Sequence, residues 1–295
     1  MFSLLDLPSL PSTPVLEVLD IGARLEGRPR WAALRDRGAA RVTAFEPQAE
    51  DRGRLESLGP GITCLPHFLG DGSMATFHVT RWPGNCSLLE PDPPAVDAFN
   101  GLGASHPEGN FHVLSTERVQ TTRLDDVPKL PRPDFIKLDI QGAELSVLQH
   151  GRETLRRAIV VECEALFVPL YRDQPLFGDL QVFMRNEGFL FHRFMDLTGR
   201  SYRPFLLPDP TMPVSQPLWA DAIFVRDPLQ PAAWTTPDLV VGAILLHDLY
   251  ASFDLAFRLL SEHDVRTASN LAADYFALLK QASPLQDGFV SVARR

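Results

Sequence analysis

Four side chains that can accept or donate protons lie close together between Asp134 and Gly151. They are Lys137, Asp139, Gln141 and Glu144. A carboxylate, an ammonium group and an amide at this spacing can remove a proton and stabilise the negative charge that results. The first two alternate with apolar residues, which is the period of a strand, and a helical pattern begins at Gly142. Ligands of open parallel sheets bind beyond the carboxyl ends of such strands, so we expect a site here.

Further strand and helix signals alternate along the chain and define the scaffold that must position these groups. We expect strands at 15–21, 41–46, 62–69, 75–80, 135–140 and 158–163, and an antiparallel pair at 188–194 and 218–225. Strands that alternate with helical segments predict right-handed crossovers. The predicted fold class is therefore α/β, with a Rossmann-like, mostly parallel sheet and an antiparallel strand pair at one side.

The ends of the first two predicted strands have the residue types of a nucleoside-binding site. Asp20 closes the first strand, Gly22 and Ala23 form a small-residue turn, and Glu46 closes the second strand. An ionised carboxylate after the second strand can accept hydrogen bonds from both ribose hydroxyls. The turn is not Gly-x-Gly-x-x-Gly, so this pattern by itself is a weak signal.

Two ligand classes compete for such a site, dinucleotides and S-adenosylmethionine. Asp20 and Glu26 place carboxylates around the first turn, which would oppose a pyrophosphate but tolerate a methionine ammonium group. Tyr171 is followed four places on by Pro175, so the Tyr-x-x-x-Lys pair of one dehydrogenase class is absent. These residues favour methyl transfer. An NAD(P)-dependent oxidoreductase and a non-catalytic donor-binding interaction protein remain as alternatives.

At this point the sequence resembles the FkbM family of S-adenosylmethionine-dependent methyltransferases, which have a Rossmann-like class I fold. The resemblance covers most of residues 15–227. It is carried by Val18-Leu-Asp-Ile-Gly-Ala-Arg24, Ala44-Phe-Glu-Pro47, Asn85-Cys-Ser-Leu-Leu89, Thr121-Thr-Arg-Leu-Asp125 and Lys137-Leu-Asp-Ile-Gln-Gly-Ala-Glu144, together with 160–177 and 219–227. One departure is that Arg24-Leu-Glu-Gly27 stands where many members have a second glycine two residues after the alanine.

The resemblance implies an O-methyltransferase that acts on a hydroxyl of a small molecule, sugar or glycan. It places Asp20, Gly22 and Ala23 at the methionine part of the donor and Glu46 at its ribose. Arg24 and Asp71, the latter in the turn after the third predicted strand, complete the expected cofactor-binding set.

For the reaction itself, Asp139 is the first candidate for the general base, because the acceptor hydroxyl must lose a proton. Lys137 would orient Asp139 or stabilise a developing alkoxide, and Gln141 would hydrogen-bond the acceptor. Glu144 is a candidate substrate ligand, although an acid in a first helical turn is stabilised anyway. Asp139 with Glu162 or Glu164 could hold Mg²⁺, but no dense ligand set supports a metal, so we do not favour one.

The composition narrows the classes of partner and compartment. A net charge of −9 over 295 residues, without a basic run, argues against a nucleic-acid substrate. The three cysteines form neither a disulfide framework nor a zinc spacing. We expect no secretory signal, because no Lys or Arg precedes Arg24, and no apolar run approaches membrane-spanning length. The expectation is a soluble cytoplasmic protein without membrane contact.

The chain is expected to have two parts, a methyltransferase-like domain at 1–227 and a helical extension at 228–295. A Pro- and Gly-rich stretch around 83–115 is predicted to form a substrate loop over the site. After Pro228 the composition becomes helical, with segments at 240–260 and 266–279. These helices could support a homo-oligomer, cap the sheet or bind another protein.

Overall fold

The structure is a computed structural model, and it describes residues 2–10, 12–24, 27–212 and 215–282. The chain divides into two compact units. Residues 17–227 form one unit, and residues 1–16 with 228–295 form the other. The N-terminal segment therefore groups with the helices after Pro228, whereas the sequence analysis had placed it with the sheet. Glu26, which entered the argument about the cofactor, lies outside the described residues.

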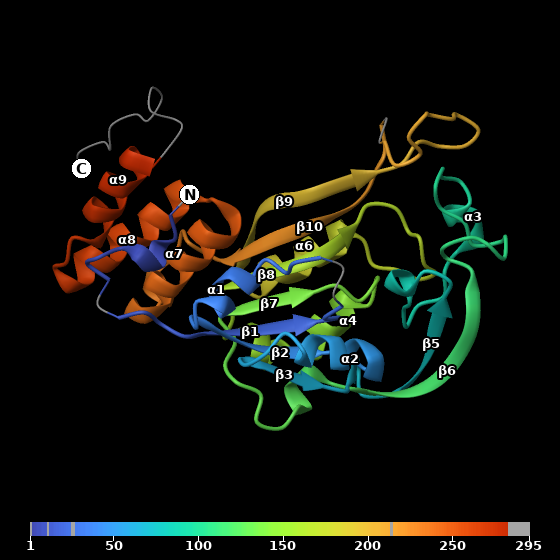
Figure 1. Cartoon of the computed structure of the whole chain (residues 1–295), viewed down its shortest axis with the longest axis horizontal. Coiled ribbons are helices and arrows are strands. Elements are labelled where there is room, and N and C mark those ends of the chain that lie inside the picture. The colour runs from blue at the N-terminus through green and yellow to red at the C-terminus, as the bar shows by residue number, and fades with distance from the viewer. Residues whose placement is uncertain (1, 11, 25–26, 213–214, 283–295) are drawn as a thin grey trace. The chain divides into compact units, whose positions relative to one another are not determined.

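A seven-stranded sheet forms the centre of the 17–227 unit (Figure 1). Its strands are, in spatial order, β3 (Ile62–Leu65), β2 (Ala40–Phe45), β1 (Leu16–Ile21), β7 (Phe135–Leu138), β8 (Val160–Leu166), β10 (Pro217–Arg226) and β9 (Phe189–Gly199). β7 pairs in parallel with both β1 and β8, and β3 pairs in parallel with β2. β10 is antiparallel to both of its neighbours. The predicted α/β fold with an antiparallel pair at one side is confirmed.

Helices cover both faces of this sheet. They are α1 (Ala32–Asp36), α2 (Ala49–Glu56), α4 (Glu144–Gln149), α5 (Arg152–Leu155) and α6 (Phe177–Asn186). On β2, Phe45 packs in the large core with residues of α4, α5 and α6, whereas Ala44 packs with Leu55 of α2. Adjacent residues of a strand point to opposite faces, so these two cores lie on opposite sides of the sheet.

A second sheet has three strands, β4 (Phe68–Leu69), β6 (Val113–Thr122) and β5 (Met74–Thr80). β5 and β6 are antiparallel, which gives the expected strand at 75–80 its partner. The single strand expected at 62–69 is wrong, because the chain leaves the main sheet at Pro66 and pairs again as β4. Most of the expected 83–115 loop is irregular, apart from the 3-10 helix η2 (Pro83–Asn85) and the short helix α3 (Pro93–Val96), and β6 begins within its last residues.

The other unit consists of three helices and the described part of the N-terminal segment. The helices are α7 (Thr236–Tyr250), α8 (Phe253–Thr267) and α9 (Leu271–Ala282). The continuous segment expected at 240–260 breaks at Ala251, which has a left-handed backbone conformation. Buried His247 lies 2.9 Å from the Tyr275 hydroxyl and 2.9 Å from the Phe2 carbonyl oxygen, so it ties the N-terminal segment to two helices. No helix among the described residues is long and apolar enough to span a membrane.

Candidate active site

A cavity of about 460 Å³ lies at the carboxyl ends of the central strands. Its lining includes five of the predicted site residues, Gly22, Arg24, Glu46, Asp139 and Gln141. The other five, Asp20, Ala23, Asp71, Lys137 and Glu144, do not line it. The position agrees with the edge at which open parallel sheets bind ligands.

Gly22 connects the end of β1 to the loop that follows β7. Its φ of +78° lies in the left-handed region, and a Cβ built on it would stand 1.9 Å from the Asp139 carbonyl oxygen. Its N–H donates to the Phe45 carbonyl at the end of β2, at 3.1 Å. Ala23 is buried and donates to the same carbonyl at 3.2 Å. The small residues of this turn therefore allow three strand ends to meet at the cavity floor.

Glu46 presents a largely buried carboxylate to the cavity. It is 7% exposed, and its Oε1 accepts the backbone N–H of Gln48 at 2.7 Å. Burial raises the pKa of Glu46, and the hydrogen bond from Gln48 opposes this rise. A carboxylate fixed in this way can accept hydrogen bonds from a ligand that enters the cavity.

Asp71 does not reach the cavity. Its Oδ1 accepts from the Ser73 hydroxyl at 2.6 Å and from the Ser73 N–H at 2.8 Å. These hydrogen bonds lower the pKa of Asp71. Its carboxylate stabilises the turn between β4 and β5, so the structure does not support the cofactor-binding role that we had expected.

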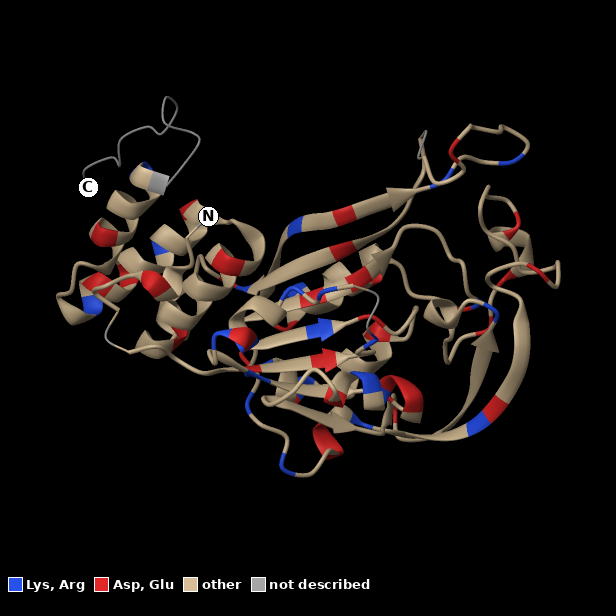
Figure 2. Cartoon of the chain, in the orientation of Figure 1, with Lys and Arg blue, Asp and Glu red and all other residues tan. Residues whose placement is uncertain are grey.

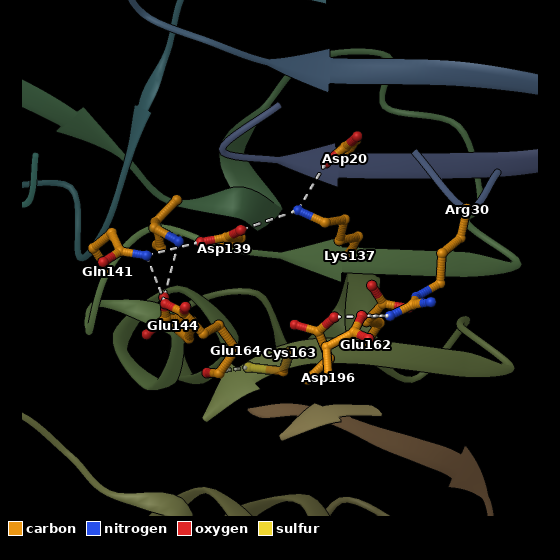
Figure 3. Close-up of polar contacts among 12 residues, drawn as sticks. Asp20, Arg30, Lys137, Asp139, Gln141, Glu144, Glu162, Cys163, Glu164 and Asp196 are labelled. Carbon is orange, nitrogen blue, oxygen red and sulfur yellow. Dashed lines mark hydrogen bonds and ion pairs between the residues drawn. The ribbon is translucent and has the colours of Figure 1, made fainter. Parts of the chain in front are cut away.

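Lys137 lies beneath the cavity in a row of charges across the sheet (Figure 3). It is paired in register with Asp20 on β1 and with Glu162 on β8. Its Nζ is 3.4 Å from Asp139 Oδ2 and 3.9 Å from Asp20 Oδ1. Burial alone would lower the pKa of Lys137, but the carboxylates of Asp139 and Asp20 raise it, so the ammonium group stays charged. Lys137 is placed to orient Asp139.

Asp20 belongs to this buried row and not to the cavity wall. Its Oδ2 accepts the indole N–H of Trp31 at 2.7 Å. Burial raises the pKa of Asp20, while Lys137 and Trp31 act in the opposite direction. Direct contact with the methionine part of a donor was expected of Asp20, whereas the structure gives it a supporting position.

Arg30 neutralises the acids on the other side of Lys137, an arrangement that the sequence analysis did not predict. Its Nε is 3.2 Å from Glu162, its Nη2 is 3.1 Å from Asp221, and it also pairs with Asp196 (Figure 3). Glu162 is therefore engaged away from Asp139. Among the described residues, no group of three or more His, Cys, Asp or Glu side chains is arranged to hold a metal ion.

Gln141 joins two carboxylates at the cavity. Its Nε2 donates to Asp139 Oδ1 at 3.1 Å and to Glu164 Oε2 at 2.7 Å (Figure 3). Its Oε1 accepts the Tyr171 hydroxyl at 3.1 Å, and its backbone carbonyl accepts the Ser87 hydroxyl at 2.7 Å. The backbone has a φ of +60°, which turns the side chain toward this network. Both donors of the amide are used, so Gln141 fixes Asp139 more directly than it could fix a ligand.

Glu144 holds the turn that carries Asp139 and Gln141. The side chain is 5% exposed, and its carboxylate accepts the N–H groups of Ile140 at 2.9 Å and Gly142 at 2.9 Å. Burial raises its pKa to about 7, against the effect of these hydrogen bonds. Glu144 does not line the cavity, and its position in the first helical turn is that of an acid which stabilises the turn.

Glu164 is a cavity residue that our predicted catalytic set omitted. The sequence had suggested it as a possible metal ligand, and because it follows Glu162 by two places it shares the same face of β8. Burial raises the pKa of Glu164 well above its usual value, and the neighbouring carboxylates of Asp139 and Glu144 raise it further. The neutral form of Glu164 is therefore favoured beside Asp139.

The remaining wall is provided by the long loop and by the antiparallel side of the sheet. Residues 82–88, Leu102, Asn110 and Phe111 line the cavity, so part of the expected 83–115 substrate loop does border it. Leu166, Leu170, Trp219 and Arg200 form the wall near β8 and β10. Figure 2 shows acidic and basic segments interspersed over the elements around it.

Comparisons with solved structures return other methyltransferases. Magnesium protoporphyrin IX methyltransferase (ChlM) from Synechocystis PCC 6803, solved with bound SAM, has 10% identity and a TM-score of 0.38, over 73% of this chain and 72% of that chain. Precorrin-6y C5,15-methyltransferase from Geobacter metallireducens GS-15 has 15% identity and a TM-score of 0.34, over 75% and 85% of the two chains. No curated protein matches this sequence.

The Methyltransferase FkbM domain matches residues 20–191, which is more than half of the chain. The matched range contains the last two residues of β1, the whole of β2, β7 and β8, and the cavity residues at the ends of these strands. The chain therefore belongs to the FkbM methyltransferase family, and methyl transfer is its class of activity.

Proposed function

We propose that this protein is an S-adenosylmethionine-dependent O-methyltransferase whose acceptor is a hydroxyl of a small molecule or glycan. The observation that carries this proposal is the environment of Asp139. Its side chain is 39% exposed at the cavity, and Lys137 and Gln141 hold one carboxylate oxygen each. A carboxylate that is both accessible and fixed in orientation has the properties of a general base.

The residues at the β1 and β2 ends fit an adenosyl donor. Glu46 supplies an acceptor for ribose hydroxyls, and the compact turn at Gly22 leaves the strand ends open to the cavity. The cavity volume of about 460 Å³ falls within the usual range of ligand pockets. When bound, S-adenosylmethionine would supply an electrophilic methyl group on a sulfonium and would leave as neutral S-adenosylhomocysteine.

The chain itself would manage the proton of the acceptor. Asp139 would take the hydroxyl proton as the new oxygen–carbon bond forms, which avoids a cationic product. Lys137 places its ammonium nitrogen 3.4 Å from one oxygen of Asp139, and Gln141 fixes the plane of the carboxylate. Glu164, favoured in its neutral form, adds no second negative charge beside the base.

The test of this proposal is calorimetric titration with S-adenosylhomocysteine and, separately, with NAD. We expect micromolar binding of S-adenosylhomocysteine, and we expect Glu46→Gln to weaken it about 10-fold through loss of a charge-assisted hydrogen bond. Glu50→Gln is the matched control, because Glu50 is 80% exposed on α2 and does not line the cavity. Binding of NAD alone would support an oxidoreductase. S-adenosylhomocysteine binding without turnover on any hydroxyl compound would support a non-catalytic protein.

A further inference from the structure

Arg200 lies at the end of the cavity opposite Glu46. Glu46 follows β2, whereas Arg200 follows β9 and its guanidinium stacks over the ring of Trp219 on β10, 5.1 Å from the ring centroid. Four strand spacings separate β2 from β10, which is roughly 19 Å at about 4.8 Å a strand. Asp139 follows β7, between these two ends. A donor held at Glu46 would therefore leave the Arg200 end to the acceptor.

The guanidinium of Arg200 has one terminal nitrogen without a protein partner. Its Nη1 donates to the carbonyls of Gly199 at 2.7 Å and Thr211 at 3.4 Å. Its Nε is buried beside Gly101 and is inaccessible to a ligand. Its Nη2 donates to none of the described residues and is not among the buried atoms. Because Arg200 lines the cavity, Nη2 can donate a charge-assisted hydrogen bond to an anionic group there.

Arg200 also differs from Arg30, another half-buried arginine of this region, because it lacks an ion pair with an acid. Arg30 contacts three carboxylates. Arg200 makes no ion pair within 4.0 Å among the described residues, and its electrostatic interaction is with Asp209, an exposed residue. Its positive charge is therefore available at the cavity wall.

The neighbours of Arg200 on this wall are mainly apolar. Leu166, Leu170, Phe111 and Trp219 line the same end of the cavity. Leu170 and Phe111 are buried in one core cluster, against which Trp219 packs. An occupant of this end would therefore have an apolar face together with one negatively charged group.

We propose that the methyl acceptor carries a carboxylate, which pairs with Nη2 of Arg200 above Trp219 while the acceptor hydroxyl lies at Asp139. This inference rests on the proposed function. A carboxylate fits better than a phosphate, because one guanidinium faces a cavity that also contains the Asp139 carboxylate. A dianion would be repelled more strongly by this carboxylate than a monoanion would. Arg200 is thus a specificity residue at the acceptor end.

The test compares carboxylic acids with their neutral analogues as acceptors. The probes are 4-hydroxybenzoate, 4-hydroxyphenylacetate and glucuronate, against 4-hydroxybenzamide, 4-hydroxyphenylacetamide and glucose, with S-adenosylhomocysteine formation as the readout. Phenyl phosphate and glucose 6-phosphate test the phosphate alternative by competition. We expect a preference for the acid of at least about 10-fold in kcat/KM, the scale of one hydrogen bond to a charged group. Quenching of Trp219 fluorescence by the acids, lost in Trp219→Phe, gives a readout independent of turnover.

The variants separate charge from folding. Arg200→Gln should reduce the acid preference to less than about 3-fold, and Arg200→Lys should keep an intermediate preference through its charge. Arg185→Gln is the matched control, because Arg185 is exposed on α6 and does not line the cavity. All three variants should bind S-adenosylhomocysteine as the wild type does, which shows that the fold is kept.

The outcomes distinguish this inference from the proposed function. Failure of the wild type to bind S-adenosylhomocysteine would overturn the proposed function. Normal donor binding with equal use of acids and neutral analogues would overturn the Arg200 inference alone. The Arg200 inference is also overturned if Arg200→Gln keeps the acid preference, or if the phosphates compete more strongly than the acids. It is overturned as well if none of the acids is methylated and none of them quenches the fluorescence of Trp219.

Discussion

Gly22 and Asp139 are in contact through their backbones, although 116 positions separate them in the chain. A Cβ on Gly22 would stand 1.9 Å from the Asp139 carbonyl oxygen, and the Asp139 N–H donates to the Ile21 carbonyl at 3.0 Å. The turn at Gly22, which is expected to contact the methyl donor, thus packs directly against the backbone of Asp139, the candidate general base. The glycine is required for this close approach of two backbone segments.

We predict that Gly22→Ala destabilises the protein by more than the backbone strain alone would. Gly38 is the matched control, because its φ of +71° is close to the +78° of Gly22 but nothing lies within 4 Å of a Cβ there. Gly38→Ala should cost about 1–2 kcal/mol, the usual penalty for a left-handed residue. Gly22→Ala should cost several kcal/mol, because a backbone atom must move. Urea unfolding measures both, and equal losses would contradict the packing argument.

The buried pair of Lys137 and Asp20 gives a second prediction. Lys137→Met should lower the free energy of unfolding by about 3–5 kcal/mol, because it leaves the buried Asp20 carboxylate without its counter-charge. Adding Asp20→Asn should recover much of this loss, since the amide oxygen can still accept the Trp31 N–H. Chemical unfolding of the single and double variants measures the coupling. An additive double variant would show that the two side chains do not interact energetically.

Asp139 and Glu164 share the amide of Gln141, and a third prediction separates their roles. Asp139→Asn should lower kcat by at least about 100-fold, the scale of a lost general base, with S-adenosylhomocysteine affinity unchanged. Glu164→Gln should lower kcat by less than about 10-fold, because an amide resembles the neutral carboxyl that burial favours. Steady-state kinetics measures kcat for both variants, and titration with S-adenosylhomocysteine checks that each variant still binds the donor product. The reverse ranking would make Glu164 the base.

The central part of the fold could be predicted because its local signals agree with its packing. The strand at Phe135–Leu138 has apolar residues on the core side, and the antiparallel partners β9 and β10 carry short apolar runs at 189–191 and 222–225. The antiparallel pairing of β10 with β9 confirms the expected closing pair. The position of the site could be predicted because open parallel sheets bind ligands at the carboxyl ends of their strands. This rule depends on the topology of the sheet more than on individual side chains.

The parts that were missed lack such signals. β6 was not predicted because most of its residues are exposed and polar, so no alternation with an apolar core marks it. The division of roles between Asp139 and Glu144 was also not visible, because both are acids near one turn. Only the direction of the Glu144 carboxylate, toward the N–H groups of Ile140 and Gly142, shows that it stabilises the turn.

The final prediction concerns the pH dependence that Glu144 gives to stability. Burial raises its pKa from 4.5 to about 7 in the folded protein, so the fold binds a proton here more tightly than the unfolded chain does. This contribution to stability is fully present below pH 4.5 and is lost as the pH rises through about 7. The full contribution to the free energy of unfolding is on the order of 3 kcal/mol, because each unit of the pKa rise corresponds to about 1.36 kcal/mol.

Glu144→Gln removes this titration and keeps an oxygen that can accept the N–H groups of Ile140 and Gly142. Urea unfolding at pH 5 and pH 8 should therefore show a smaller loss of stability with rising pH in the variant than in the wild type. Asp221, whose raised pKa does not involve Glu144, titrates in both proteins and cancels in this comparison. The Glu144 carboxylate does raise the pKa of Glu164, so the comparison is repeated in a Glu164→Gln background. Glu153→Gln is the control, because Glu153 is an exposed acid in the first turn of α5. If Glu144→Gln and Glu153→Gln change the pH dependence equally, Glu144 does not carry a raised pKa in the folded state, and its carboxylate holds the turn in ionised form.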